Sequence, residues 1–343
     1  MSAAKSPKTP KSLKSLKTRL TEFFDIEHPI LAAPMALISG GRLAAAATSG
    51  GGLGLIGGGY GDSDWLQREF ALAEGTRVGC GFITWSLARK PELLDQTLER
   101  QPATIMLSFG DLQPFADRIH AAGIPLIAQV QTLDQARQAL DAGAEILVAQ
   151  GGEAGGHGMT VRSTFTLVPD VVDLAAQHSP ETLVLAAGGV VDGRGLAAAL
   201  TLGADGALVG TRFWASPEAL VSPRAQQRAL RASGDDTYRT RVYDVVRRLD
   251  WPPQYNERTL SNPFVDGWHG NESELLSSLP DAVSTFEAGV AAEDFDVAAM
   301  FVGEAIGRIN DVCPAADLVA EMAAEANRIL NGENGFSPRS VQG

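Results

Sequence analysis

The chain has 343 residues, 45% hydrophobic and 20% charged, so it is long enough to bury the core of one large α/β domain. Its net charge of −13 argues against nucleic acid or an anionic membrane as a partner, and no apolar run reaches the roughly 18 residues of a membrane span. The two cysteines, Cys80 and Cys313, fit neither a disulfide framework nor a zinc site, so we expect a cytoplasmic location and no metal.

The first 21 residues are basic and contain no acid. Serines and prolines separate the cations, which are Lys5, Lys8, Lys11, Lys14, Lys17 and Arg19. This composition predicts a disordered basic arm over residues 1–21. Organelle targeting by the arm is the alternative, although arginine is scarce for a targeting peptide and no apolar core of a secretory signal is present.

From residue 22 onward, short apolar runs of strand length alternate with helical patterns. The runs cover residues 29–33, 53–56, 78–84, 104–107, 126–130, 146–149, 183–187 and 207–209. One link shows the helix signals clearly, with a capping box at Thr132-x-x-Gln135 and Gly143 at the helix end. Eight such units predict a (β/α)8 TIM barrel over residues 22–216. A doubly wound sheet is the alternative, but it would need fewer strands and usually a G-x-G-x-x-G after the first, where Pro34-Met35 stands instead.

After the eighth strand the pattern changes, and residues 217–295 are richer in charge and aromatics. We predict a mostly helical insertion that forms a lid over the barrel mouth, with an extended loop from residue 251 to 263. Trp268 is expected to cover the mouth, and His269 beside it is a weaker candidate to reach the site. Residues 296–330 are predicted to close the fold with helices at 298–306 and 315–330, before a flexible tail at 331–343.

The active site of a TIM barrel lies at the carboxyl ends of its strands, and the loops after strands seven and eight commonly hold a phosphate. Gly188-Gly189 follows the seventh strand and Gly210-Thr211-Arg212-Phe213 follows the eighth. Backbone N–H groups in such loops form an anion nest, to which Thr211 would add a hydroxyl and Arg212 a guanidinium.

The glycine-rich segment 148–159 follows the sixth strand and carries an amide, a carboxylate and an imidazole at Gln150, Glu153 and His157. His157 is the best-placed acid–base group because its neutral form is available at pH 7. Glu153 is a second candidate base, but a carboxylate in such a turn more often holds backbone N–H groups. The alternative is a plain connection with a surface histidine. Structural roles are expected for His28, His120 and His178.

The segment Gln150-Gly151-Gly152-Glu153-Ala154-Gly155-Gly156-His157 resembles the nitronate monooxygenase family, formerly called 2-nitropropane dioxygenases. The loops at 186–189 and 210–213 and the Ala33-Pro34-Met35 that ends the first strand also match, and the resemblance spans about residues 22 to 330. It implies an FMN-binding TIM barrel that oxidises alkyl nitronates with molecular oxygen.

The resemblance also implies roles for single residues. His157 would be the catalytic base, and Ala33, Pro34 and Met35 would pack near the isoalloxazine ring. The other FMN contacts would be Gln150, Gly155, Gly188, Gly189, Gly210, Thr211, Arg212 and Phe213. One departure stands at the third strand, where many members carry an asparagine that contacts the flavin and this chain has Cys80-Gly81-Phe82-Ile83-Thr84.

Two other functions stay as alternatives. One is an FMN-dependent reductase that uses NAD(P)H to reduce a quinone or an enoyl thioester, although no nicotinamide fingerprint is visible. The other is a non-catalytic flavin or phosphate-binding protein, which would need the anion nest but no imidazole. The expected partners are a small-molecule substrate and O2, with a homodimer as a further expectation.

Overall fold

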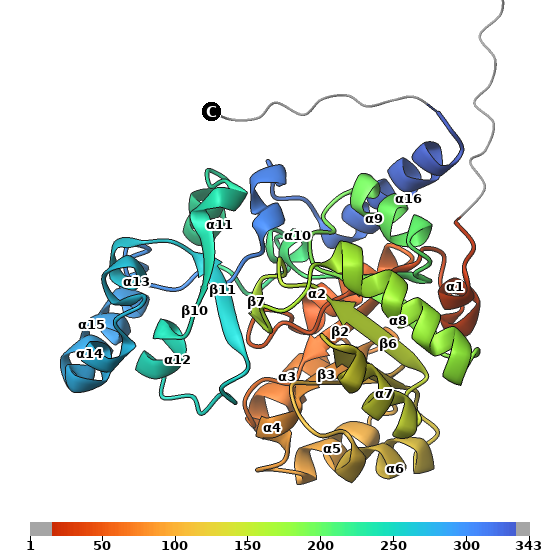
Figure 1. Cartoon of the computed structure of the whole chain (residues 1–343), viewed down its shortest axis with the longest axis horizontal. Coiled ribbons are helices and arrows are strands. Elements are labelled where there is room, and N and C mark those ends of the chain that lie inside the picture. The colour runs from red at the N-terminus through yellow and green to blue at the C-terminus, as the bar shows by residue number, and fades with distance from the viewer. Residues whose placement is uncertain (1–15, 334–343) are drawn as a thin grey trace, which may run out of the picture.

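The computed structural model describes residues 16–333, and its centre is a closed barrel of eight parallel strands (Figure 1). The strands follow the order β1-β2-β3-β4-β5-β6-β8-β9, and β9 returns to pair with β1 through Leu31 and Leu208. The predicted TIM barrel is therefore confirmed. Their bounds are β1 Ile30–Ala32, β2 Leu53–Gly57, β3 Gly79–Ile83, β4 Ile105–Ser108, β5 Leu126–Val130, β6 Ile146–Gln150, β8 Leu183–Ala187 and β9 Gly206–Val209.

These strands are apolar throughout because each has one face in the barrel and the other under helices. Leu31, Leu53 and Ile127 belong to the cluster that fills the barrel, whereas Leu107 and Ala128 pack in the cluster beneath the surrounding helices. The helices between the strands are α2 Gly41–Ser49, α3 Ser63–Leu72, α4 Thr84–Leu87, α5 Glu92–Leu98, α6 Gln113–Ala121, α7 Leu133–Asp141, α8 Thr164–His178 and α9 Gly193–Thr201.

The predicted ends of α7 are confirmed, but the full capping box is not, because Gln135 Oε1 accepts from the N–H of Gln131 and not from that of Thr132. The Thr132 hydroxyl accepts a hydrogen bond from the backbone N–H of Gln135, and Gly143 beyond the helix adopts a φ of 78°. A left-handed residue at this position suits glycine, because any other residue would meet a steric penalty.

The predicted basic arm ends earlier than residue 21. Residues 1–15 lie outside the described part of the chain, but helix α1 Arg19–Phe24 begins within the expected arm. Leu20 and Phe24, one helical turn apart, are buried in the barrel cluster, and Arg19 forms a 2.7 Å ion pair with Asp205. The prediction was wrong at residues 19–21 because the basic composition concealed this apolar face.

The insertion contains the predicted helices, and Figure 1 shows them to one side of the barrel. It also contains two strands, one of which lies where an extended loop was expected. Strands β10 Thr237–Thr240 and β11 Asn256–Leu260 form an antiparallel sheet with β7 Gly156–Gly158 of the glycine-rich segment. The sheet thus joins the insertion to the loop that carries His157. Helix α10 Thr211–Trp214 directly follows β9, and the helical elements of the insertion are α11 Pro223–Ala229, η1 Gly234–Asp236, α12 Val242–Val246, α13 Pro263–Trp268, α14 Glu272–Ser277 and α15 Leu279–Ala291.

Of the two predicted closing helices, one is confirmed. Helix α16 Ala315–Leu330 packs against α9 and α2, but residues 298–303 are not helical and are followed by the short 3-10 helix η2 Glu304–Arg308. Of the predicted tail, residues 334–343 lie outside the described part. Among the described residues, no helix is long and apolar enough to cross a membrane.

Candidate active site

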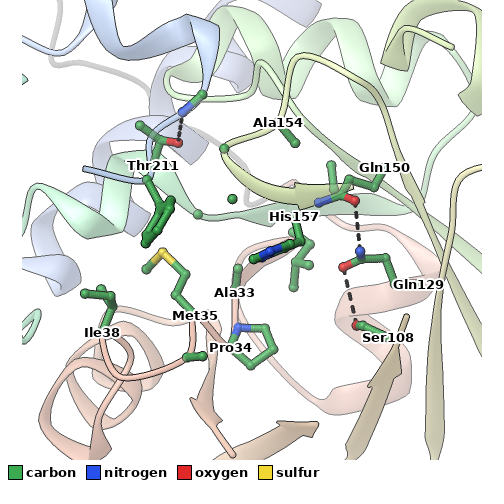
Figure 2. Close-up of a pocket in the computed structure, with 18 of the residues that line it drawn as sticks. Ala33, Pro34, Met35, Ile38, Ser108, Gln129, Gln150, Ala154, His157 and Thr211 are labelled. Carbon is green, nitrogen blue, oxygen red and sulfur yellow. Dashed lines mark hydrogen bonds between the residues drawn. The ribbon is translucent and has the colours of Figure 1, made fainter. Parts of the chain in front are cut away.

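A cavity opens at the carboxyl ends of the barrel strands, where the sequence places the site (Figure 2). Ten of the twelve predicted site residues line it, and they come from five different strand ends or loops. These ten are Ala33, Pro34, Met35, Gln150, Gly155, His157, Gly188, Gly189, Gly210 and Thr211.

The loops after β8 and β9 form a side of the cavity that is rich in backbone donors. Gly188 and Gly189 both have left-handed backbone, with φ of 104° and 73°, and a Cβ at Gly188 would lie 2.8 Å from the Thr164 hydroxyl. The Thr211 hydroxyl accepts a 3.0 Å hydrogen bond from the N–H of Gly303, which leaves its own proton available to a ligand. The Gly188 position is thus fixed by packing on Thr164, and these loops offer an anionic group backbone and one hydroxyl as donors.

Arg212 and Phe213, the other two predicted contacts, do not line the cavity. The Arg212 guanidinium donates to the backbone oxygen of Asp311 at 2.9 Å and to its carboxylate at 2.7 Å, and Phe213 is fully buried. Each successive helical residue is rotated by about 100°, so Thr211 and Trp214, three residues apart on α10, line the cavity while Arg212 and Phe213 point away from it.

A chain of amides crosses the opposite side of the cavity. Gln150 Oε1 accepts hydrogen bonds from Gln129 Nε2 at 2.9 Å and from Gln131 Nε2 at 2.5 Å, and Ser108 donates to Gln129 Oε1 at 3.4 Å. These bonds fix the Gln150 amide with its oxygen satisfied, so that its N–H groups can donate to a ligand. Gln129, Gln131 and Ser108 were not singled out in the sequence, although all three follow or end buried strands.

His157 belongs to β7 and lines the cavity, and one of its two ring nitrogens is hydrogen-bonded to a buried carboxylate. Its Nε2 lies 2.9 Å from Asp244 Oδ1, and the Trp251 ring stacks on the imidazole with centroids 3.4 Å apart and planes 6° from parallel. Burial lowers the pKa of His157 below 6.5 even though Asp244 opposes the shift, so the imidazole is neutral at pH 7. Because the carboxylate accepts, Nε2 carries the proton and Nδ1 carries the lone pair.

A second buried acid lies behind this pair. Glu257 is directly opposite His157 in the β11–β7 register, its Oε2 lies 3.7 Å from His157 Nε2, and its Oε1 accepts from the N–H of Tyr243. Burial and the charge of Asp244 raise the pKa of Glu257 well above 4.5. Asp244 Oδ2 and Glu257 Oε2 are buried with no hydrogen-bond partner among the described residues. One proton on Glu257 would leave Asp244 as the single anion of the pair.

The same three residues have a spacing that could also hold a metal ion. Their ligand-type atoms lie within 4.8 Å of one another, and a proton on Glu257 would remove one of the two carboxylate charges that face each other here.

Comparison with known proteins gives the family. The family model described as nitronate monooxygenase matches residues 17–76 and 88–325. The chain belongs to the nitronate monooxygenase family. A nitronate monooxygenase from Metarhizium robertsii is 36% identical over 330 residues, which cover 88% of this chain and 91% of the relative. The chain is accordingly an oxidoreductase of a flavin-dependent family.

Solved structures agree with this family. The FabK structure from Thermotoga maritima matches with a TM-score of 0.80 and 29% identity. The match covers 94% of this chain and 100% of the FabK chain. The nitroalkane oxidase from Streptomyces ansochromogenes matches with a TM-score of 0.74 and 26% identity, covering 91% of this chain and 99% of that one.

Among the described residues the insertion contributes one aromatic ring to the cavity, that of Trp251, and it is not the expected one. Trp251 lines the cavity together with Tyr60 and Phe109, whose ring centroids are 6.4 Å and 5.1 Å from that of Trp251. Trp268 instead packs in a separate cluster around Tyr243, and the His269 ring lies 4.6 Å from Tyr238. Trp251 was not selected because position and composition alone do not show which aromatic of a long insertion turns inward.

The remaining sequence candidates have structural roles. Glu153 accepts hydrogen bonds from the N–H of Thr164 at 3.0 and 3.2 Å, as expected for a carboxylate that holds backbone. His28, His120 and His178 do not line the cavity. At β3, a Cβ on Gly81 would lie 2.2 Å from the Pro34 ring, so the close packing of this strand end against Pro34 requires glycine. Burial raises the pKa of the neighbouring Cys80 thiol, which is consistent with an inert structural role.

Proposed function

We propose that this chain is an FMN-dependent enzyme that oxidises alkyl nitronates with molecular oxygen, and that His157 is the general base for neutral nitroalkanes. The observation that carries the proposal is a neutral imidazole in the cavity whose Nε2 is held by Asp244 at 2.9 Å. Relatives named nitronate monooxygenase and nitroalkane oxidase support the substrate class.

The cavity residues fit FMN in three respects. Gly188, Gly189 and Gly210 line the cavity with backbone and no side chain, which suits a phosphate, and Thr211 can add a hydroxyl proton. A Cβ on Gly210 would lie 3.7 Å from both Ala33 Cβ and Met35 Sδ, so the phosphate side continues into an apolar strip suited to a flat ring. Gln150 can donate its amide to a ring heteroatom. When bound, FMN would supply the electron acceptor that the side chains lack.

His157 can move a proton because one nitrogen is occupied and the other is free. Nδ1 has no hydrogen-bond partner within residues 16–333, so its lone pair can accept the α-proton of a neutral nitroalkane. The imidazolium that results is stabilised by the Asp244 carboxylate at Nε2, as an acid stabilises the histidine of a hydrolase triad. A nitronate has already lost this proton and does not need the base.

The test compares the two substrate forms in the variant His157→Asn. Asparagine keeps a donor of similar reach but cannot accept a proton at neutral pH, so turnover of neutral nitroalkanes should fall about 10²–10⁴-fold. Oxidation of preformed nitronates should fall much less, and FMN content should stay unchanged. Oxygen uptake with each form measures both effects. Equal losses would mean that His157 orients the substrate and is not its base.

The NAD(P)H-dependent reductase alternative makes the opposite prediction for the wild-type protein. We expect anaerobic addition of a nitronate to bleach the flavin absorbance and NADH alone to leave it unchanged. Rapid bleaching by NADH, without an effect of nitronates, would favour the reductase and reject our proposal.

A further inference from the structure

Arg247 is a cation in the cavity wall without an acceptor. It directly follows helix α12, is half-buried and lines the same cavity as His157. Across residues 16–333 its guanidinium donates no hydrogen bond and forms no ion pair. Two aromatic rings hold it instead, since its guanidinium carbon lies 5.4 Å from the ring centre of Tyr60 and 5.4 Å from that of Phe301.

Two other arginines near the barrel mouth, Arg239 and Arg258, are held by acceptors of the protein. Arg239 donates to the carbonyl oxygens of Gly152, Ala154 and Asn256, and Arg258 forms a 2.8 Å ion pair with Glu304. These two tie the β7–β10–β11 sheet to the glycine-rich segment. Arg247 has no such structural bond to make, so its role differs from theirs.

Ring contacts position a guanidinium without using its N–H groups. A cation over an aromatic face is attracted to the ring, while its five donors stay in the guanidinium plane. Donors left unpaired in a partly desolvated cavity are unfavourable unless a ligand accepts from them. Arg247 is therefore oriented for a ligand that carries acceptor oxygens.

The charge of Arg247 also acts on the reacting end of the cavity. It contributes to the lowered pKa of His157 and opposes the raised pKa of Glu257, which places it within electrostatic range of both. Asp244 is hydrogen-bonded at Nε2 of the imidazole. Among the described residues that line the cavity, Arg247 is the permanent cation, so a substrate anion in the cavity can bind to it.

We propose that Arg247 binds the anionic head of the substrate, a planar group with two acceptor oxygens such as a nitronate. The inference rests on the proposed function for the identity of the anion. A guanidinium fork matches two oxygens of a planar anion in a bidentate pair. The same contact would stabilise the anion formed when His157 deprotonates a neutral nitroalkane.

The first measurement uses nitrate as an unreactive planar anion. Isothermal titration calorimetry on the flavin-loaded protein, at constant ionic strength, compares the wild type with Arg247→Met, which keeps an apolar stem between Tyr60 and Phe301. We expect nitrate binding to weaken about 10- to 100-fold, as for loss of a charge-assisted hydrogen-bonded pair. Arg247→Lys keeps the charge without the planar fork and should lie between the two.

Arg248→Met is the matched control, because Arg248 is the next residue, is exposed and does not line the cavity. It should bind nitrate like the wild type. Circular dichroism and flavin content show whether each variant is folded, and the Lys variant gives a second reading if the Met variant is not.

Steady-state kinetics provide the second measurement. With a preformed nitronate, Arg247→Met should raise KM about 10- to 100-fold and change kcat by less than about threefold, because the contact is made in the ground state. Three results would each overturn the proposal. They are an unchanged nitrate affinity in Arg247→Met, an equal weakening of nitrate binding in Arg248→Met, and no nitrate binding by the wild type. Nitrate binding requires no turnover, so a wild type that binds nitrate but fails to oxidise nitronates would refute only the proposed function.

Discussion

The contact between His157 and Asp244 can be tested by Asp244→Asn, which removes one charge and little volume. Asp244 Oδ1 lies 2.9 Å from Nε2 and the side chain is 1% exposed. Coulomb's law gives about 6 kcal/mol for unit charges at this distance with an effective dielectric constant of about 20, and about 1.4 kcal/mol in bulk water. Hydrogen bonds to charged groups usually contribute about 1.5–3 kcal/mol, which corresponds to roughly a 10- to 100-fold loss in rate.

The loss should appear only where His157 becomes positively charged. Turnover of neutral nitroalkanes should fall about 10- to 100-fold, whereas preformed nitronates, which need no base, should be oxidised within about threefold of the wild-type rate. Nitronate oxidation is thus an internal control for folding and FMN content.

The pH profile gives a second readout of the same variant. Burial lowers the pKa of His157, while the hydrogen bond and charge of Asp244 raise it. Wild-type kcat/KM for neutral nitroalkanes should therefore fall only when the pH drops below the ordinary histidine pKa of about 6.5. In Asp244→Asn this fall should occur at still lower pH. A loss below about twofold, or an acid limb that moves to higher pH, would refute the positioning role of Asp244.

Two further predictions concern Glu257 and Gly189. Because the pKa of Glu257 is raised by burial and by Asp244, its contribution to stability is complete below its ordinary 4.5 and decreases as pH rises. The thermal stability of Glu257→Gln relative to wild type should therefore increase from about pH 5 to about pH 8, while nitroalkane turnover stays nearly unchanged. If the difference in thermal stability between the two proteins did not change with pH, Glu257 would be ionised throughout. Gly189→Val should reduce bound FMN, measured by absorbance, because it adds a side chain to the proposed phosphate loop. Gly123→Val is its control, since Gly123 also has a left-handed φ of 69° but nothing within 4 Å, and equal FMN loss in both variants would indicate general destabilisation.

The barrel could be predicted from the sequence because its signals are local. Each strand is a short apolar run buried on both faces, and each connecting helix begins and ends with residues such as Thr132 and Gly143, whose preferences depend on neighbours only. Strand order then follows from the right-handed connection of parallel strands. The topology also brings loop residues such as Gly189 and Thr211 to one end of the barrel, so most of the lining on the side of the β8 and β9 loops could be predicted as well.

The side of the cavity around His157 was decided by tertiary structure. Asp244, Arg247 and Trp251 lie about 90 residues after His157 along the chain, and they reach it because β10 and β11 pair with the three-residue strand β7. Short polar strands such as β7 and β11 carry little periodic signal, since their pairing depends on a partner distant in sequence. For the same reason, the outward turn of Arg212 toward Asp311 could not be predicted. Local preference determined the barrel, whereas long-range strand pairing selected the charges that surround His157.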